Sequence, residues 1–378
     1  MQVATVITSE GKTRYMLLDS NMEPIQPVNQ YIKFKDNSGS ARNTLRSYCH
    51  HLKLYFEFLE QKRLNYRDVN IDDMAEFLRW LQNPYGNFKV ASITPTKPIR
   101  RAGTCNIIIS VVLGFYDYLM RHEDYSIQLS ERLKRSISGS RRGYKDFLYH
   151  VNRNKKYTAK ILKLKEPRKD HLKILTKEQV NQIVDACVNL RDKFLITLLW
   201  ETGMRIGEAL ALWLENFEVD TRVVHIEDRG ELINGAEIKT VCSPRSIDIS
   251  SDLMNMFLDY VAQYHTDDVD TNHCFIKLSG LNKYEPLEYQ DITSLFKRLQ
   301  HKTGIQWLHP HILRHSSLDS LRRAGWEPEK VQKRAGHAQV QTTMNVYFHV
   351  ADEELHDQWV KTEKQIKLNR KQGELIDS

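Results

Sequence analysis

The chain is poor in cysteine, with five in 378 residues, and no two of them form a CxxC pair. A few scattered thiols in odd number argue against a disulfide framework or a zinc knuckle and favour a reducing compartment. Long apolar runs are also missing. The most apolar stretch, around residues 107–113, is too short and too interrupted to span a membrane, and no signal peptide opens the chain. We therefore expect a cytoplasmic protein without membrane contact.

Two further absences limit the chemistry. The sequence has no glycine-rich phosphate loop and no cluster of carboxylates of the kind that holds Mg²⁺. We therefore expect no nucleotide cofactor and no metal. Internal repeats and low-complexity tracts are missing as well. The composition, 41% hydrophobic and 27% charged, is that of an ordinary globular protein, and a chain of this length is expected to form two domains.

Positive charge is concentrated in one stretch of the chain. The net charge is +7, yet residues 131–170 alone hold 14 Lys or Arg against four Asp or Glu, and we call them the basic segment. Such a segment suits a strap laid along DNA phosphates, with Lys155, Lys156 and Lys160 as candidate contacts. A solvated linker would have the same composition, and a linker that wraps a duplex would be both.

The spacing of apolar residues predicts the fold class. Residues 3–18 alternate like a β-hairpin, which could bind DNA or cap the next domain. Residues 40–125 repeat apolar side chains at three- and four-residue steps, as helices do, and Asp72 or Asp73 is expected to cap the second helix. Beyond residue 172, helices flank alternating strands between residues 222 and 249.

We therefore expect a mainly α protein with a small β-sheet (α+β). A new domain should begin at the capping box formed by Thr176 and Gln179. The expected segments are a small β module (1–35), a helical DNA-binding domain (36–130), a basic linker (131–172), a second domain (173–352) and a tail helix (353–378). The tail keeps an amphipathic spacing, which suits docking on a neighbouring subunit or folding back on its own domain.

One ordered set of residues carries the chemistry. In chain order it is Arg205, Glu208, His311, Arg314, His337 and Tyr347. Guanidinium groups can clamp a phosphodiester through paired hydrogen bonds, and a phenol can attack it. Each member alone has a plainer explanation: a surface ion pair for Arg205 and Glu208, a structural histidine, a core tyrosine. The histidines between 309 and 315 invite a zinc site, but their spacing and the lack of a nearby Cys or Glu argue against it.

In this order and spacing, the set resembles the catalytic domain of the tyrosine recombinases, the lambda-integrase-like phage integrase family. The resemblance covers roughly residues 174–350 and is densest from the His311 motif onward. The helical domain and basic linker before it resemble the core-binding domain and interdomain connection of that family. The first forty residues and the tail after Asp352 carry no family signature.

The resemblance implies a role for each site residue. Arg205, Arg314, His311 and His337 would hold the scissile phosphate, and Tyr347 would attack it to form a 3′-phosphotyrosine. Negative charge develops on the phosphate oxygens during this attack, and fixed donors aimed at them lower the barrier.

The family also uses a lysine on a β-hairpin. Here Lys239 is the best match and would protonate the leaving 5′ oxygen, whereas Arg245, across the Pro244 turn, is a less suitable substitute. Glu208 matches a supporting acidic position. With two arginines on the phosphate, this chemistry requires neither metal nor cofactor.

The expected function is site-specific DNA recombination, in the integration, excision or transposition of a mobile element. The expected partner is double-stranded DNA, bound by a homotetramer, and accessory proteins are left open. Two rivals stand beside this expectation. A type IB topoisomerase would relax supercoils with similar chemistry, and a non-catalytic DNA-binding protein would need no competent site.

Overall fold

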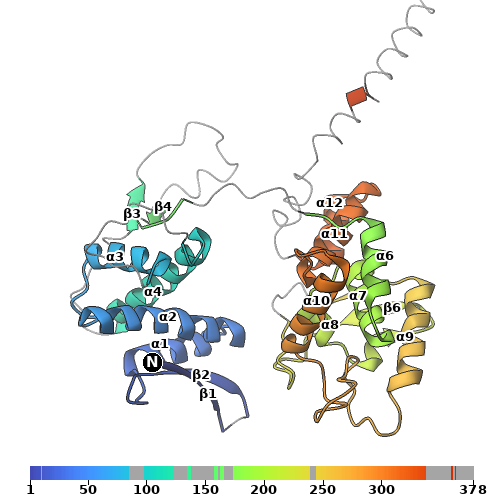
Figure 1. Ribbon diagram of the computed structural model, residues 1–378, viewed down its shortest axis with the longest axis horizontal. Coiled ribbons are helices and arrows are strands. Elements are labelled where there is room, and N and C mark those ends of the chain that lie inside the picture. Colours follow the sequence, from blue (N-terminus) through green and yellow to red (C-terminus); the bar gives the residue numbers. More distant parts are fainter. Residues whose placement is uncertain are drawn as a thin grey trace, which may run out of the picture. The chain divides into compact units, whose positions relative to one another are not determined.

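The chain folds into two compact units, Met1–Arg168 and Lys169–Ser378. Each is built mostly of helices and carries small antiparallel sheets (Figure 1). This confirms the expected mainly α fold with small sheets. The computed structural model describes residues 1–9, 11–84, 98–122, 134–137, 157–160, 162–165, 173–238, 244–337, 359, 360 and 362.

The first unit is a helical bundle with an N-terminal hairpin. Its elements are β1 (Gln2–Ile7), β2 (Thr13–Leu18), α1 (Gln26–Asn37), α2 (Arg42–Lys62), α3 (Ile71–Gln82) and α4 (Ala102–His122). Apolar side chains recurring every three or four residues give each helix one buried face. Aromatic rings dominate the core, where Tyr55 packs edge-on against both Phe77 and Tyr116.

The N-terminal hairpin belongs to this bundle. Leu17 on β2 is fully buried in the core. The side chain of Asn29 on α1 pairs with both backbone groups of Leu17, accepting from its N–H at 2.9 Å and donating to its carbonyl at 3.2 Å. Of the two roles considered for the hairpin, this packing supports a cap on the helical domain.

One expected helix start was wrong. Asn70 caps α3, and its side-chain oxygen accepts from the backbone N–H groups of Asp72 and Asp73. Asp73 then closes a capping box by accepting from the Asn70 N–H at 2.9 Å. Asparagine and aspartate are nearly equivalent as helix caps, so the sequence offered three candidates within four residues.

The apolar stretch at residues 107–113 lies in helix α4, and the expectation that it is too short to span a membrane was wrong by length and composition alone. Half of its most apolar window is buried, however, and residues such as Ile108, Ile109, Val112 and Phe115 lie in the core of the first unit. The helix therefore has the features of a core helix of this unit.

The expected basic linker contains ordered structure. β3 (Lys134–Ile137) and β4 (Tyr157–Lys160) pair in antiparallel register. Leu162 and Leu164 then pack against the core of the first unit, and Leu164 exchanges two hydrogen bonds with the Asn106 side chain on α4. Residues 162–165 thus belong to the first unit, while the predicted division into five segments stays a prediction.

The second unit carries the predicted chemistry. Its elements are α6 (Lys177–Ala186), α7 (Leu190–Thr202), α8 (Ile206–Leu210), a 3-10 turn (Leu214–Asn216), β5 (Phe217–Glu218), β6 (Val223–Ile226), β7 (Arg245–Asp248), α9 (Ser251–Tyr264), α10 (Tyr289–Thr303), α11 (Pro310–Arg323) and α12 (Pro328–Ala335). The sheet order is β5-β6-β7, all antiparallel. Ile238, expected in a strand, lies outside any strand, and the following residues 239–243 lie outside the described residues.

Helix α7 is the centre of this unit. It is buried or half-buried along its whole length and packs against α6, α9 and α11. It ends, as expected, at Gly203, whose φ of +64° favours glycine. A Cβ there would also come within 3.0 Å of the Ser317 hydroxyl on α11. This close approach brings the chain leading into α8 directly against α11.

Candidate functional site

Arg205 stands at the start of α8 and is held by Glu208. The backbone N–H of Arg205 donates to Glu208 Oε2 at 2.8 Å, and its Nη1 donates to Oε1 at 2.8 Å. Glu208 is only 2% exposed, whereas the Arg205 side chain is 24% exposed. The pair is therefore not the surface ion pair of the plainer explanation, because the buried carboxylate fixes a guanidinium that still reaches solvent.

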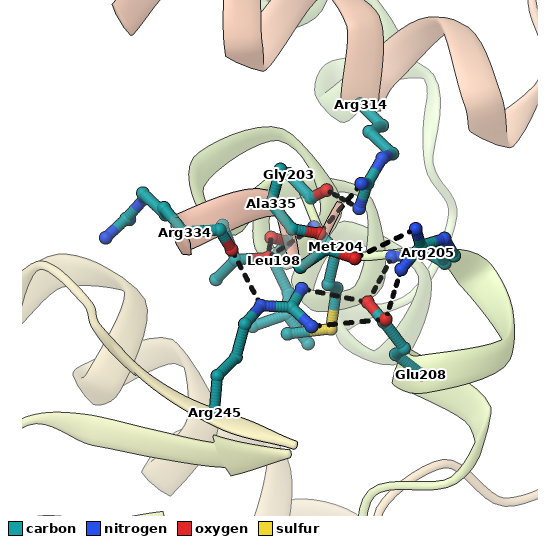
Figure 2. A network of polar contacts seen from close by, with 11 residues as sticks. Leu198, Gly203, Met204, Arg205, Glu208, Arg245, Arg314, Arg334 and Ala335 are labelled. Carbon is teal, nitrogen blue, oxygen red and sulfur yellow. Dashed lines mark hydrogen bonds and ion pairs between the residues drawn. The ribbon is translucent and has the colours of Figure 1, made fainter. Parts of the chain in front are cut away.

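Arg314 on α11 is almost completely buried, at 2% exposure. Its Nη1 donates to the Gly203 carbonyl at 2.7 Å and its Nη2 to the Ala335 carbonyl at 2.7 Å (Figure 2). Burial first, then the nearby Arg205, lowers the pKa of Arg314 to about 9. With this pKa the guanidinium remains protonated at neutral pH. Its buried charge therefore favours an anion as a ligand.

His311 and His337 complete the cluster. His311 is on the first turn of α11, and His337 directly follows Gly336, which ends α12 with φ +64°. Burial is the main cause that lowers the pKa of both, and the arginines add to it, so that the pKa of His337 falls to about 3. Both imidazoles are neutral near pH 7, and each offers one N–H donor and one acceptor nitrogen.

A cavity of about 390 Å³ opens beside these residues. Its lining includes Arg205, Glu208, His309, His311 and Arg314, together with Glu237 and Tyr289. Three guanidinium groups, those of Arg205, Arg245 and Arg314, lie around the carboxylate of Glu208. Glu237 adds a second carboxylate to the cavity lining. Three guanidinium groups against two carboxylates leave a small positive excess, which fits a bound anion such as a phosphodiester.

The histidines between 309 and 315 do not form a metal cluster. The rings of His311 and His315 meet edge-to-face at 4.6 Å. Within the described ranges, no group of three or more His, Cys, Asp or Glu side chains could hold a metal ion.

Several predicted site residues fall outside the described residues. These are Lys239, Tyr347, Lys155 and Lys156. Lys160 ends strand β4, and its side chain is not among those described. The structure thus brings together Arg205, Glu208, His311, Arg314 and His337, while the roles of all the site residues stay predictions.

Sequence reasoning missed three contributors to this region. Arg245 had been considered only as a substitute for Lys239, yet it binds both oxygens of Glu208 at 3.1 and 2.9 Å. Tyr289 lines the cavity from α10, and Glu237 does so two residues before Lys239. No spacing rule marks any of them, because their partners lie on other elements.

Comparisons with known proteins agree with the geometry. The family model described as "Phage integrase family" matches residues 173–354, and the model "Phage integrase, N-terminal SAM-like domain" matches residues 28–123. Transposase A from transposon Tn554 of Staphylococcus aureus is 37% identical over 348 residues, which cover 92% of this chain and 93% of that protein. Tyrosine recombinase XerC of Staphylococcus saprophyticus is 22% identical, over 88% of this chain and 95% of that protein.

Solved structures show the same fold. The Tn1549 transposon integrase in complex with a circular intermediate DNA matches with a TM-score of 0.58 and 18% identity, over 89% of this chain and 99% of that one. XerH site-specific recombinase bound to difH substrate matches with a TM-score of 0.56 and 17% identity, over 88% and 84%. With the near full-length match to the Tn554 transposase and the two family models in register, the chain belongs to the phage integrase family and is a tyrosine-type site-specific recombinase.

Proposed function

We propose that this recombinase integrates, excises or transposes a mobile element by cutting and rejoining DNA through a covalent 3′-phosphotyrosyl intermediate. The observation that carries the proposal is the gathering of Arg205, Arg314 and His311 in the lining of one cavity, with His337 close to both arginines. The near full-length likeness to a transposon-encoded transposase supports the assignment to a mobile element.

The residue types define each step. The Tyr347 oxygen attacks phosphorus, and the bond from phosphorus to the 5′ oxygen breaks. The 3′ end of the cut strand remains joined to Tyr347 through the phosphate. His311, neutral because burial lowers its pKa, accepts the phenol proton. Lys239 gives a proton to the departing 5′ oxygen. Attack by the 5′ hydroxyl of a second strand then reverses these transfers and releases Tyr347, so the bond energy is conserved.

DNA is the proposed substrate, and a homotetramer on two duplexes is the proposed assembly, in a cytoplasmic setting. Guanidinium groups with neutral imidazoles suit phosphate oxygens, which every DNA sequence presents. The target sequence is therefore to be found by experiment. The direct test is to express the protein in cells that carry its flanking DNA and to map covalent protein–DNA joints. Joints at a defined site support the proposal, and none anywhere would contradict it.

A type IB topoisomerase is the main rival. It would relax a supercoiled plasmid that lacks any recombination site, whereas a recombinase needs its own sites for efficient joining. A non-catalytic DNA-binding protein would give neither result. The helical DNA-binding bundle and the similarity to a transposase both favour the recombinase.

The role of Lys239 can be tested with a changed leaving group. A duplex whose 5′-bridging oxygen is replaced by sulfur needs no proton to depart. We expect Lys239→Ala to cleave normal DNA about 10²- to 10⁴-fold more slowly, the usual contribution of a general acid, and to cleave the sulfur duplex almost like wild type. Single-turnover cleavage rates on both duplexes measure this. An equal loss on both would give Lys239 another role.

The basic segment makes a separate prediction about salt. Neutralising a phosphate releases condensed counterions, so affinity falls with salt in proportion to the number of contacts. Changing Lys155, Lys156 and Lys160 to Gln should weaken binding to all sequences alike. The slope of log affinity against log salt should become shallower by about 0.9 for each lost contact. Filter binding or anisotropy over a salt series measures both.

A charge-matched control separates position from net charge. Lys283, Lys297 and Lys330 are exposed on the second unit, and changing them to Gln removes the same charge. The slope should change much less in this control. An unchanged slope in the basic-segment variant would mean that the segment is a solvated linker, and a changed site preference would mean that its lysines read bases.

A further inference from the structure

The C-terminal end of α12 is capped by guanidinium groups from three other places in the fold. Three consecutive residues, Arg334, Ala335 and Gly336, each accept a hydrogen bond through the carbonyl oxygen. The donors are, in the same order, Arg245 at 2.7 Å, Arg314 at 2.7 Å and Arg205 at 3.1 Å. Figure 2 shows the first two of these contacts. The last carbonyls of a helix have no partner within it and form the negative end of its dipole, so cations bind there favourably.

Arg245 differs from the other two donors in its position. Arg205 and Arg314 line the cavity, whereas Arg245 is not among the described residues that line it. Its side chain is 7% exposed and starts on β7. Two of its nitrogens bind the two oxygens of Glu208 in a fork, and the third binds the end of α12 (Figure 2). Such paired bonds fix both partners in orientation.

These contacts connect Arg245 to both arginines of the cavity. Through Glu208 it reaches Arg205, because the same carboxylate binds the backbone and side chain of that residue. Through the carbonyl of Arg334 it holds the residue next to Ala335, on which Arg314 is anchored. Burial alone would raise the pKa of Glu208, but the bonds and charge of Arg245, followed by those of Arg205, outweigh it and lower that pKa.

A second hydrogen bond joins β7 and α12, and here the side-chain donor is on α12 and the carbonyl acceptor is on β7. The Arg334 side chain donates from Nη2 to the Asp248 carbonyl at 3.1 Å, at the far end of β7 from Arg245. It also donates to the carbonyl of Glu201 on α7 at 3.2 Å. Strand β7 and the end of α12 are therefore joined by two reciprocal guanidinium–carbonyl bonds, which make their spacing rigid.

We propose that Arg245 is a positioning residue for the cleavage reaction: it sets Glu208 and the end of α12, and through them the two arginines that face the phosphate. It touches neither the phosphate nor the leaving oxygen. This inference rests on the proposed function and assigns to Arg245 a role distinct from that of a proton donor.

The expected effect lies on the rate of cleavage and not on DNA binding. Misplacing a phosphate ligand by about 1 Å can cost about 10²-fold in rate. DNA affinity, by contrast, comes from many phosphate contacts spread over the protein. We expect Arg245→Gln to slow single-turnover cleavage about 10²-fold with DNA affinity changed less than about threefold. Arg245→Lys should recover little, because a single ammonium cannot form the three-way fork.

The decisive experiment is a double-mutant cycle with Glu208→Gln in the full-length protein. The substrate is a nicked duplex carrying the sequence at which the wild type becomes joined to DNA. If Arg245 acts through Glu208, Arg245→Gln and Glu208→Gln together should be no slower than the slower single variant. The defect should also be equal on oxygen and 5′-sulfur duplexes. A matched control is Arg229→Gln, which removes a guanidinium paired with Glu215 and Glu227 in the same unit.

Several results would overturn the inference. One is a double variant whose loss of rate is the product of the two single losses. Another is recovery of the Arg245→Gln rate on the sulfur duplex, and a third is a wild-type rate in Arg245→Lys. Thermal unfolding midpoints of all variants identify any that fail to fold. If Arg245→Gln is unfolded, Arg245→Lys takes its place in the cycle. Failure of the proposed function looks different, because wild type and Arg229→Gln then form no covalent joint at all.

Discussion

Replacing Tyr347 with phenylalanine will abolish covalent joining to DNA while leaving the fold and DNA affinity unchanged. The substitution removes one hydroxyl oxygen, which is the proposed nucleophile, and keeps the ring. No other step of the reaction can proceed without the phosphotyrosyl bond, so the loss should be complete within detection. Denaturing gels with end-labelled nicked duplex detect the joint, and gel shifts on the same DNA measure binding.

Tyr289 supplies the matched control for this prediction. It lines the cavity from the start of α10. Tyr289→Phe should still form the joint, and mass spectrometry of the DNA-linked peptide from wild type should identify Tyr347. If Tyr347→Phe forms the joint and Tyr289→Phe does not, the nucleophile has been assigned to the wrong residue.

Arg205→Ala and Arg314→Ala should both lower cleavage by about 10³-fold, because each removes a donor to the charge that develops on the phosphate. Their effects on stability should differ. Arg314 is buried and holds two carbonyls that would lose their donor, at a cost of about 3 kcal/mol. Arg205 is partly exposed, and Arg245 still binds both oxygens of Glu208 after Arg205 is removed, so its loss should cost less, about 1 kcal/mol.

The two effects are measured on the same proteins. Single-turnover cleavage gives the loss of rate, and thermal unfolding with and without DNA gives the change in stability. Arg314→Lys is the conservative control, since it retains charge but can replace only part of the two-carbonyl contact. Equal stability of the two alanine variants would contradict the structural role assigned to Arg314. Cleavage within tenfold of wild type in either would remove that arginine from the proposed site.

The sequence alone identified most of the residues that meet at the cavity. The i,i+3 spacing of Arg205 with Glu208 and of His311 with Arg314 predicted a shared face, and the order of motifs predicted the family. Helix ends could also be predicted from the sequence, because they depend on residues close together in the chain. The capping box at Thr176 and the helix end at Gly203 depend on contacts within four residues, so their signals lie in adjacent letters.

Prediction of a helix start from the sequence was limited where several neighbouring residues could each cap the helix. Asn70, Asp72 and Asp73 are all good helix caps, and only the backbone of the folded chain chose Asn70. The alternation of side chains predicted the N-terminal hairpin, but it did not predict how the hairpin packs against the helices. The burial of Leu17 depends on Asn29 and on α2, which its own strand pattern does not encode.

Only the tertiary structure decided how the arginines are held. Arg245 lies 37 residues from Glu208 and 89 from Arg334, so no periodicity connects them. The acceptors at the end of α12 are backbone carbonyls, which every residue possesses, and no sequence pattern can mark them. The sequence thus determined which side chains could bind a phosphate. The fold determined where they point, because it placed the unpaired end of one helix within reach of three guanidinium groups.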